Sequence, residues 1–118
     1  MDKLTRKEEE VMKILWKLEK AFVKDIVEEY PDPKPHYNTI SSLVRILQDK
    51  GFVGFKQYGN TYEYFPLVPK EEYRKTFMKE IINDYFDNSF STAVASFIKD
   101  ENLSPAEIEE IMKLIKSR

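Results

Sequence analysis

The stretch YNTISSLVRILQDKGFVGFKQYGNTYEYF, residues 37–65, contains the features that decide the fold. Its first half predicts a helix from about residue 37 to residue 50, because its apolar residues follow the spacing i, i+3, i+4, i+7 of one buried face. These residues are Ile40, Leu43, Val44 and Leu47. Gly51 stands where a helix commonly ends on a left-handed residue. The second half predicts two aromatic strands joined at Gly59-Asn60, a pair typical of a tight hairpin.

Two further helices are predicted upstream of this stretch. The first opens with a capping box, Thr5 and Glu8, and its buried face is marked by apolar residues from Val11 to Leu18. The second covers residues 23–30. The proline-rich segment 31–35 must end it, because each proline removes a backbone donor and restricts the residue before it.

Three short helices followed by a β-hairpin are the winged helix-turn-helix arrangement, in which the third helix enters the DNA major groove and the hairpin flanks it. The third helix has a polar face suited to this use, and residues 34–66 carry four basic against two acidic residues. We therefore predict contacts with double-stranded DNA from the helix and from the wing. The candidate residues are Asn38, Thr39, Ser41, Ser42, Arg45, Lys50, Lys56 and Gln57.

After Pro69 the sequence reads as helix to its end. The fold class expected for the whole chain is mainly α with a small β-hairpin: a winged helix-turn-helix domain at 1–68 and a three-helix dimerisation region at 69–118. So short a region cannot bury three apolar stripes alone, and a symmetric partner chain would complete its core. The residues expected in that core are Phe77, Ile81, Val94, Phe97, Ile108, Ile111 and Ile115.

Composition excludes several other classes. The chain of 118 residues has no cysteine, one histidine and three glycines, and its net charge is −2. Disulfides, thiolate metal sites and glycine-rich phosphate loops are therefore ruled out, and no enzymatic constellation is visible. Composition does not rule out a Mg²⁺ or Ca²⁺ site built from carboxylates alone. We nevertheless expect no enzyme activity, no metal, no cofactor and no membrane insertion, and the lack of cysteine fits a cytoplasmic location.

Some residues allow two interpretations. His36 is interpreted as a loop or cap residue rather than a metal ligand. Trp16 is either a partner anchor or, as we prefer, a partly buried residue under the wing. Tyr58, Tyr62 and Tyr64 could stack on bases, but strand aromatics more often pack on neighbouring helices. The alternative to DNA binding is a winged-helix module that interacts only with protein, because the basic charge of the middle segment is small.

The chain resembles the penicillinase-repressor family of bacterial transcriptional regulators, the BlaI/MecI/CopY group. The resemblance rests on the order and spacing of short segments over nearly the full length. They are Leu4 to Trp16, Asn38 to Leu47 with Lys50 to Val53, Tyr62 to Val68, and Phe90 to Ile111. It implies a homodimeric repressor, concerned with antibiotic response, that binds a dyad-symmetric operator and dimerises through its C-terminal helices.

The resemblance also implies a means of release. Members inactivated by proteolysis are cut at an Asn–Phe bond in the fifth helix by a membrane-linked sensor metalloprotease. The matching bond here is Ser96–Phe97, where the Phe is kept and the Asn is not. A second departure lies at the start of the third helix, where His36-Tyr37 replaces the Ser-Pro of several members. Copper-responsive members use C-terminal cysteines, which this chain lacks, so metal sensing is excluded.

Overall fold

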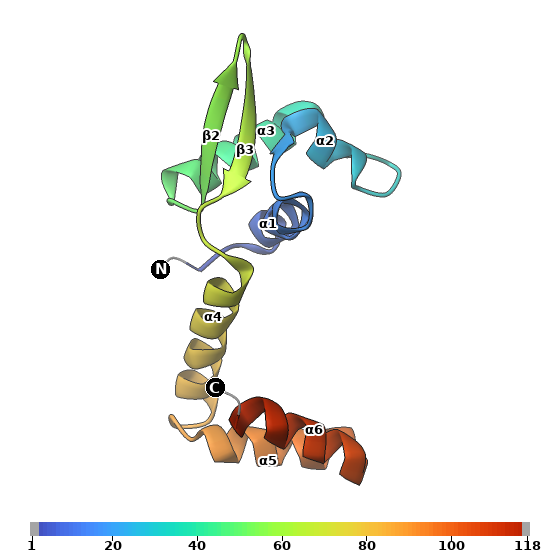
Figure 1. Ribbon diagram of the computed structural model, residues 1–118, viewed down its shortest axis with the longest axis vertical. Coiled ribbons are helices and arrows are strands. Elements are labelled where there is room, and N and C mark those ends of the chain that lie inside the picture. Colours follow the sequence, from blue (N-terminus) through green and yellow to red (C-terminus); the bar gives the residue numbers. More distant parts are fainter. Residues whose placement is uncertain (1–2, 117–118) are drawn as a thin grey trace. The chain divides into compact units, whose positions relative to one another are not determined.

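The computed structural model describes residues 3–116, apart from the side chains of residues 101, 111, 112 and 114–116. The chain forms two compact units, with the division between Thr76 and Phe77. The elements of the first unit are α1 (Arg6–Leu18), β1 (Ala21–Phe22), α2 (Val23–Glu28), α3 (Tyr37–Asp49), β2 (Val53–Tyr58) and β3 (Thr61–Pro66) (Figure 1). They are followed by α4 (Lys70–Tyr85), which begins in the first unit and ends in the second, and by α5 (Phe90–Glu101) and α6 (Pro105–Lys116).

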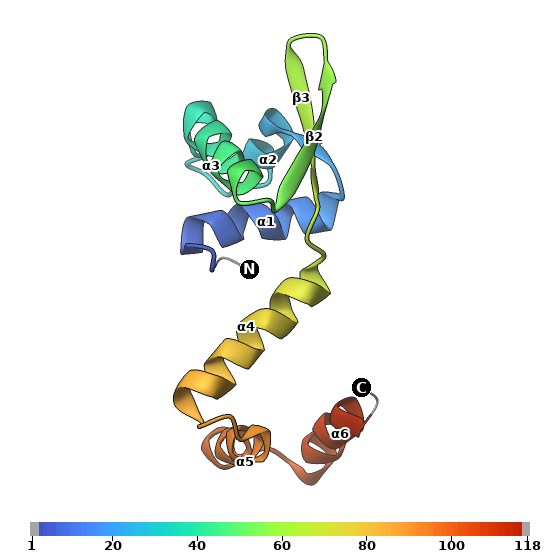
Figure 2. The same cartoon turned by 90° about the vertical axis from the view of Figure 1, so that its left-hand side faces the viewer.

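The wing is the hairpin of β2 and β3, which stands beside α3 (Figure 2). Its strands pair antiparallel, with Phe55 opposite Tyr64 and Tyr58 opposite Thr61. The turn falls at Gly59, whose φ of +61° is a left-handed conformation suited to glycine. Three helices and a β-hairpin wing make a winged helix, so the predicted fold class is confirmed.

A short strand, β1, was not expected from the sequence. It pairs with β3 through Ala21 opposite Tyr64 and Phe22 opposite Glu63, which gives a sheet of order β1-β3-β2. Two residues are too few to show a strand period. The strand ends where α2 begins, and the Phe22 amide there donates to the Asp25 carboxylate at 3.0 Å.

The core of the first unit joins the predicted helix faces to the base of the sheet. Leu15, Ile26, Val44, Leu47 and Phe52 are all buried completely or almost completely. The end of α3 is fixed as the sequence predicts, because Gly51 has a φ of +81° and the Phe52 amide donates to the Leu47 carbonyl at 2.9 Å. α2 is shorter than predicted and ends at Glu28, after which single turn bonds carry the chain to Tyr30.

The second unit consists of helices with clear start signals but little burial. Ser89 caps α5 by accepting from the Thr92 amide at 3.2 Å. Ser104 and Glu107 form a capping box at the start of α6, with bonds of 3.2 and 3.3 Å. None of the side chains described between residues 77 and 113 is fully buried in the single chain. The described apolar side chains of this unit are thus left partly uncovered.

Candidate nucleic-acid interface

The start of α3 is set by His36. Its Nδ1 atom accepts a hydrogen bond from the Asn38 amide at 3.0 Å, and its carbonyl receives the Thr39 amide at 3.0 Å. An imidazole nitrogen therefore accepts the backbone hydrogen bond that a serine or asparagine oxygen commonly accepts at the start of a helix. The interpretation of His36 as a cap residue is confirmed, and the cap fixes the backbone from which Asn38 projects.

A groove runs between α3 and the side of the wing that faces it. It has two adjoining parts, with cavity volumes of about 440 and 310 Å³, and Arg45, Tyr62 and Tyr64 line both parts. We call this surface the α3–wing groove. The larger part is also lined by Phe22, Val23, Lys24, Tyr37, Asn38, Ser41, Asn60 and Thr61, and the smaller part by Gln48, Asp49 and Phe55.

Arg45 occupies the middle of this groove. It is exposed on α3, one turn beyond Ser41. Burial raises the pKa of the Tyr64 phenol above its ordinary value of 10.0, and the Arg45 guanidinium acts in the opposite direction. The cation is therefore close enough to the wing to act on a tyrosine there. A guanidinium between a helix and a hairpin is available for a phosphate or a guanine edge.

The structure separates the predicted helix contacts into two sets. Asn38, Ser41 and Arg45 line the α3–wing groove together. Thr39 and Ser42 are exposed on α3 but outside the groove lining. On the wing, Gln57 is exposed and its side-chain amide donates to the Gly59 carbonyl at 3.0 Å.

Lys56 projects from the other face of the wing. Side chains alternate along a strand, so Lys56 points away from the groove that its neighbour Phe55 lines. Its Nζ atom lies 5.3 Å from the centre of the Tyr58 ring. Glu63 is its cross-strand partner. Lys56 is thus exposed, and Glu63 lies opposite it on the same face of the wing.

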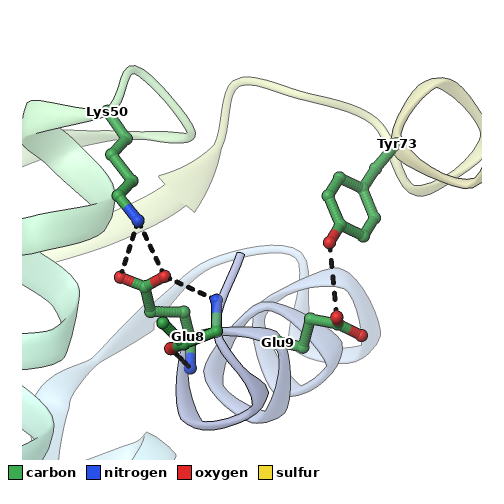
Figure 3. A network of polar contacts seen from close by, with 5 residues as sticks. Glu8, Glu9, Lys50 and Tyr73 are labelled. Carbon is green, nitrogen blue, oxygen red and sulfur yellow. Dashed lines mark hydrogen bonds and ion pairs between the residues drawn. The ribbon is translucent and has the colours of Figure 1, made fainter. Parts of the chain in front are cut away.

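Lys50 forms an ion pair with Glu8 of the same chain. Its Nζ atom donates to both carboxylate oxygens of Glu8, at 2.9 and 3.1 Å (Figure 3). Glu8 is 3% exposed, and its carboxylate also accepts from the Thr5 amide at 2.8 Å. The pair joins the start of α1 to the end of α3. The predicted contact between Lys50 and DNA remains a prediction, and an alternative use of this ammonium group is now visible.

Lys24 and Tyr37 are among the groove residues that sequence reasoning missed. Lys24 is the second residue of α2 and is exposed, and Tyr37 is the first residue of α3 and is 52% exposed. Lys24 follows buried Val23 directly, and that step from a buried to a polar residue was the available signal. Among the wing aromatics, Tyr64 packs inside as expected, whereas Tyr58 and Tyr62 are 46% and 39% exposed.

The residues expected in a dimer core lie on α4, α5 and α6. Phe77, Ile81, Val94 and Ile108 are partly exposed in the single chain, and Phe97 is 53% exposed. The side chains of Ile111 and Ile115 lie outside the described residues. The Ser96–Phe97 bond is in the middle of α5, where the Ser96 hydroxyl donates to Asp100 at 3.5 Å.

The described residues hold no group of three or more histidine, aspartate or glutamate residues placed to bind a metal ion. None of the helices in the described part of the chain combines the length and the apolar character needed to cross a membrane.

The fold and the groove define a winged-helix protein. The family model described as "Penicillinase repressor" matches residues 4–117, and the chain therefore belongs to the penicillinase repressor family, whose members are transcriptional repressors.

Individual relatives agree with this assignment. The methicillin resistance regulatory protein MecI of Staphylococcus aureus (strain N315) is 31% identical over 110 residues, which covers 92% of this chain and 89% of the relative. The penicillinase repressor of Bacillus licheniformis is 23% identical over 112 residues, covering 91% and 84%. The penicillinase repressor of Staphylococcus aureus is 25% identical over 107 residues, covering 90% and 85%.

Proposed function

We propose that this protein is a homodimeric, cytoplasmic repressor that binds a dyad-symmetric DNA operator through α3 and the wing. The observation that carries the proposal is the α3–wing groove, which gathers Asn38, Ser41 and Arg45 beside the exposed hairpin. Short polar groups next to an arginine can approach base edges while the cation holds a phosphate or a guanine. The relatives named above support the regulatory part of this proposal.

In this proposal, residues 1–68 bind DNA and residues 69–118 join the two chains of the dimer. In the groove, Lys24 adds a cation that can meet the DNA backbone across from Arg45. The relatives are named for methicillin resistance and penicillinase, which favours genes of the response to β-lactam antibiotics as the targets.

A gel-shift titration with genomic fragments tests the proposal against the alternative. A DNA-binding repressor selects particular fragments, and its affinity falls steeply as salt rises. A winged-helix module that binds only protein selects no fragment at any salt concentration. The position of the selected fragments in the genome would also identify the regulated genes.

Lys56 is expected to contribute affinity that does not depend on sequence. Lys56→Ala should weaken binding to the operator and to a scrambled duplex by the same factor, and should make the salt slope shallower by about 1. Glu63→Gln is the matched control, because it removes the neighbouring carboxylate and leaves the lysine. A loss confined to the operator would show that Lys56 reads sequence.

Phe97 is expected to be needed for the dimer. Phe97→Asp places a carboxylate where the proposed interface buries an aromatic ring, and an unpaired buried charge is strongly unfavourable. Light scattering at micromolar concentration should therefore return a dimer for the wild type and a monomer for this variant. Ala95→Asp introduces the same charge at an exposed position about half a turn away on α5, and it should remain dimeric. A dimeric Phe97→Asp protein would contradict this placement of the interface.

Release from DNA is proposed to follow cleavage of the Ser96–Phe97 bond by a membrane-linked sensor metalloprotease. The bond lies within α5, so cleavage requires local opening of the helix. Co-expression with such a protease should yield fragments 1–96 and 97–118 by mass spectrometry when a β-lactam is added, and intact chain without it. A cut elsewhere, or no cut, would remove this mechanism and leave the DNA-binding proposal in place.

A further inference from the structure

Tyr73, in the first turn of α4, is buried against the winged helix although it lies beyond the wing. It is 8% exposed, and it is the one buried residue of α4, whose residues 70–85 are all described. Its ring centre lies 5.8 Å from that of Trp16 and 5.8 Å from that of Phe52. Its hydroxyl donates to the Glu9 carboxylate at 3.3 Å (Figure 3).

The segment that leads to Tyr73 is also fixed to the winged helix. The Leu67 amide donates to the Phe52 carbonyl at 2.8 Å. The indole Nε1 of Trp16 donates to the Val68 carbonyl at 2.9 Å. Leu67 and Val68, which lead to α4, are therefore both hydrogen-bonded to the winged helix, and Trp16 is one of the residues that hold them.

These contacts hold the start of α4 against the winged helix. The first compact unit runs on to Thr76, and α4 continues from there to Tyr85 as one helix. The contacts of Tyr73 therefore hold the first turn of α4 to the winged helix. Tyr73 is the one buried side chain of α4, so no other buried side chain of this helix could replace these contacts.

We propose that Tyr73 is a positioning residue for operator binding, which sets the separation of half-sites that a dimer can occupy. This inference rests on the proposed function, because it requires a dimer that binds two half-sites. A helix-turn-helix dimer binds half-sites one DNA turn, or a multiple of it, apart, so holding the first turn of α4 against the winged helix would favour one separation. When geometry prevents simultaneous binding of both half-sites, the gain from joining them is lost.

The experiment measures the affinity of the full-length protein for a panel of duplexes. Each duplex carries the two half-sites selected by the wild type from genomic fragments, and their separation is varied in single steps over roughly ten base pairs, about one DNA turn. The wild type should prefer one separation. Tyr73→Ala should lose about tenfold or more at that separation and less at the others, so that the preference becomes flat.

Three further variants sharpen the test. Tyr73→Phe keeps the ring contacts and should retain the wild-type preference. Glu72→Gln changes an exposed neighbour in the same turn and should also retain it. If Tyr73→Ala does not fold, Tyr73→Leu, which keeps an apolar side chain but loses both ring contacts, should show the flattened preference.

Two results would overturn this inference and leave the proposed function in place. The first is an unchanged preference for one separation in the folded Tyr73→Ala or Tyr73→Leu protein. The second is an equal loss of affinity at every separation, because a loss of fold stability acts equally on all duplexes. A wild type that bound one half-site as tightly as two, or selected no fragment, would overturn the proposed function and this inference with it.

Discussion

Replacing Lys50 by methionine is expected to lower the free energy of unfolding of the first unit by about 3 kcal/mol at neutral pH. The substitution leaves the Glu8 carboxylate buried, with the Thr5 amide as its remaining hydrogen-bond donor among the described residues. A buried charge without its partner is costly because water cannot solvate it. Urea unfolding followed by the fluorescence of Trp16, the single tryptophan, reports on this unit.

A second substitution should restore most of the loss. Glu8→Gln in the Lys50→Met background removes the charge while it keeps the shape of the side chain and its capping position. The double variant should therefore be more stable than Lys50→Met alone. If the two losses simply added, the contact between Lys50 and Glu8 would contribute nothing to stability.

The same pair predicts a dependence on pH. Burial acts to raise the pKa of Glu8, but the Lys50 ammonium and the Thr5 amide outweigh it and hold the pKa below its ordinary value of 4.5. The stabilisation is therefore complete above that value and is lost as the pH falls through the lower pKa of the folded state. The stability difference between the wild type and Lys50→Met should be largest at neutral pH and should shrink below pH 4.5. A difference that stayed constant down to pH 3, roughly, would exclude the ion pair as its cause.

Arg45→Ala is expected to weaken operator binding by about 1–3 kcal/mol and to relax specificity at the bases it reads. Arg45 lines both parts of the α3–wing groove and is exposed, so its loss should leave the fold intact. Titration of operator and scrambled duplexes measures both the loss and the change in specificity. Ser42 replaced by a larger residue should also weaken binding if the surface of α3 outside the groove lies against DNA.

The matched control for Arg45 is Arg74→Ala. Arg74 is exposed on α4 and forms an ion pair with Glu71 in its own helix. The control removes an equal charge from a surface that the proposal does not place on DNA. Equal operator affinity of the wild type and both Arg45 and Ser42 variants would exclude α3 as the reading helix.

Local patterns were sufficient to predict the winged helix. The apolar spacing from Ile40 to Leu47 gave α3, and Gly51 and Gly59 marked its end and the hairpin turn, because these features depend on neighbours in sequence. β1 was missed because two residues have no period, and its pairing with β3 depends on a strand about forty residues away.

The site was only partly predictable, for a related reason. The polar face of α3 indicated Asn38, Ser41 and Arg45, and the structure brings these three together. The pairing of Lys50 with Glu8 joins residues 42 positions apart, and no spacing rule reveals it. Lys24 was marked in the sequence only as a polar residue after an apolar one, because its place in the groove depends on how α2 packs against α3.

The central claim, that operator DNA lies in the α3–wing groove, is tested most directly by NMR titration of the labelled protein with the selected operator. The signals of Lys24, Asn38, Ser41 and Arg45 should move on addition of operator, and those of Tyr62 on the wing should move with them. A scrambled duplex at the same salt concentration should produce smaller changes. Changes confined to α4, α5 and α6, or an operator that moved no signal of the groove, would contradict the account.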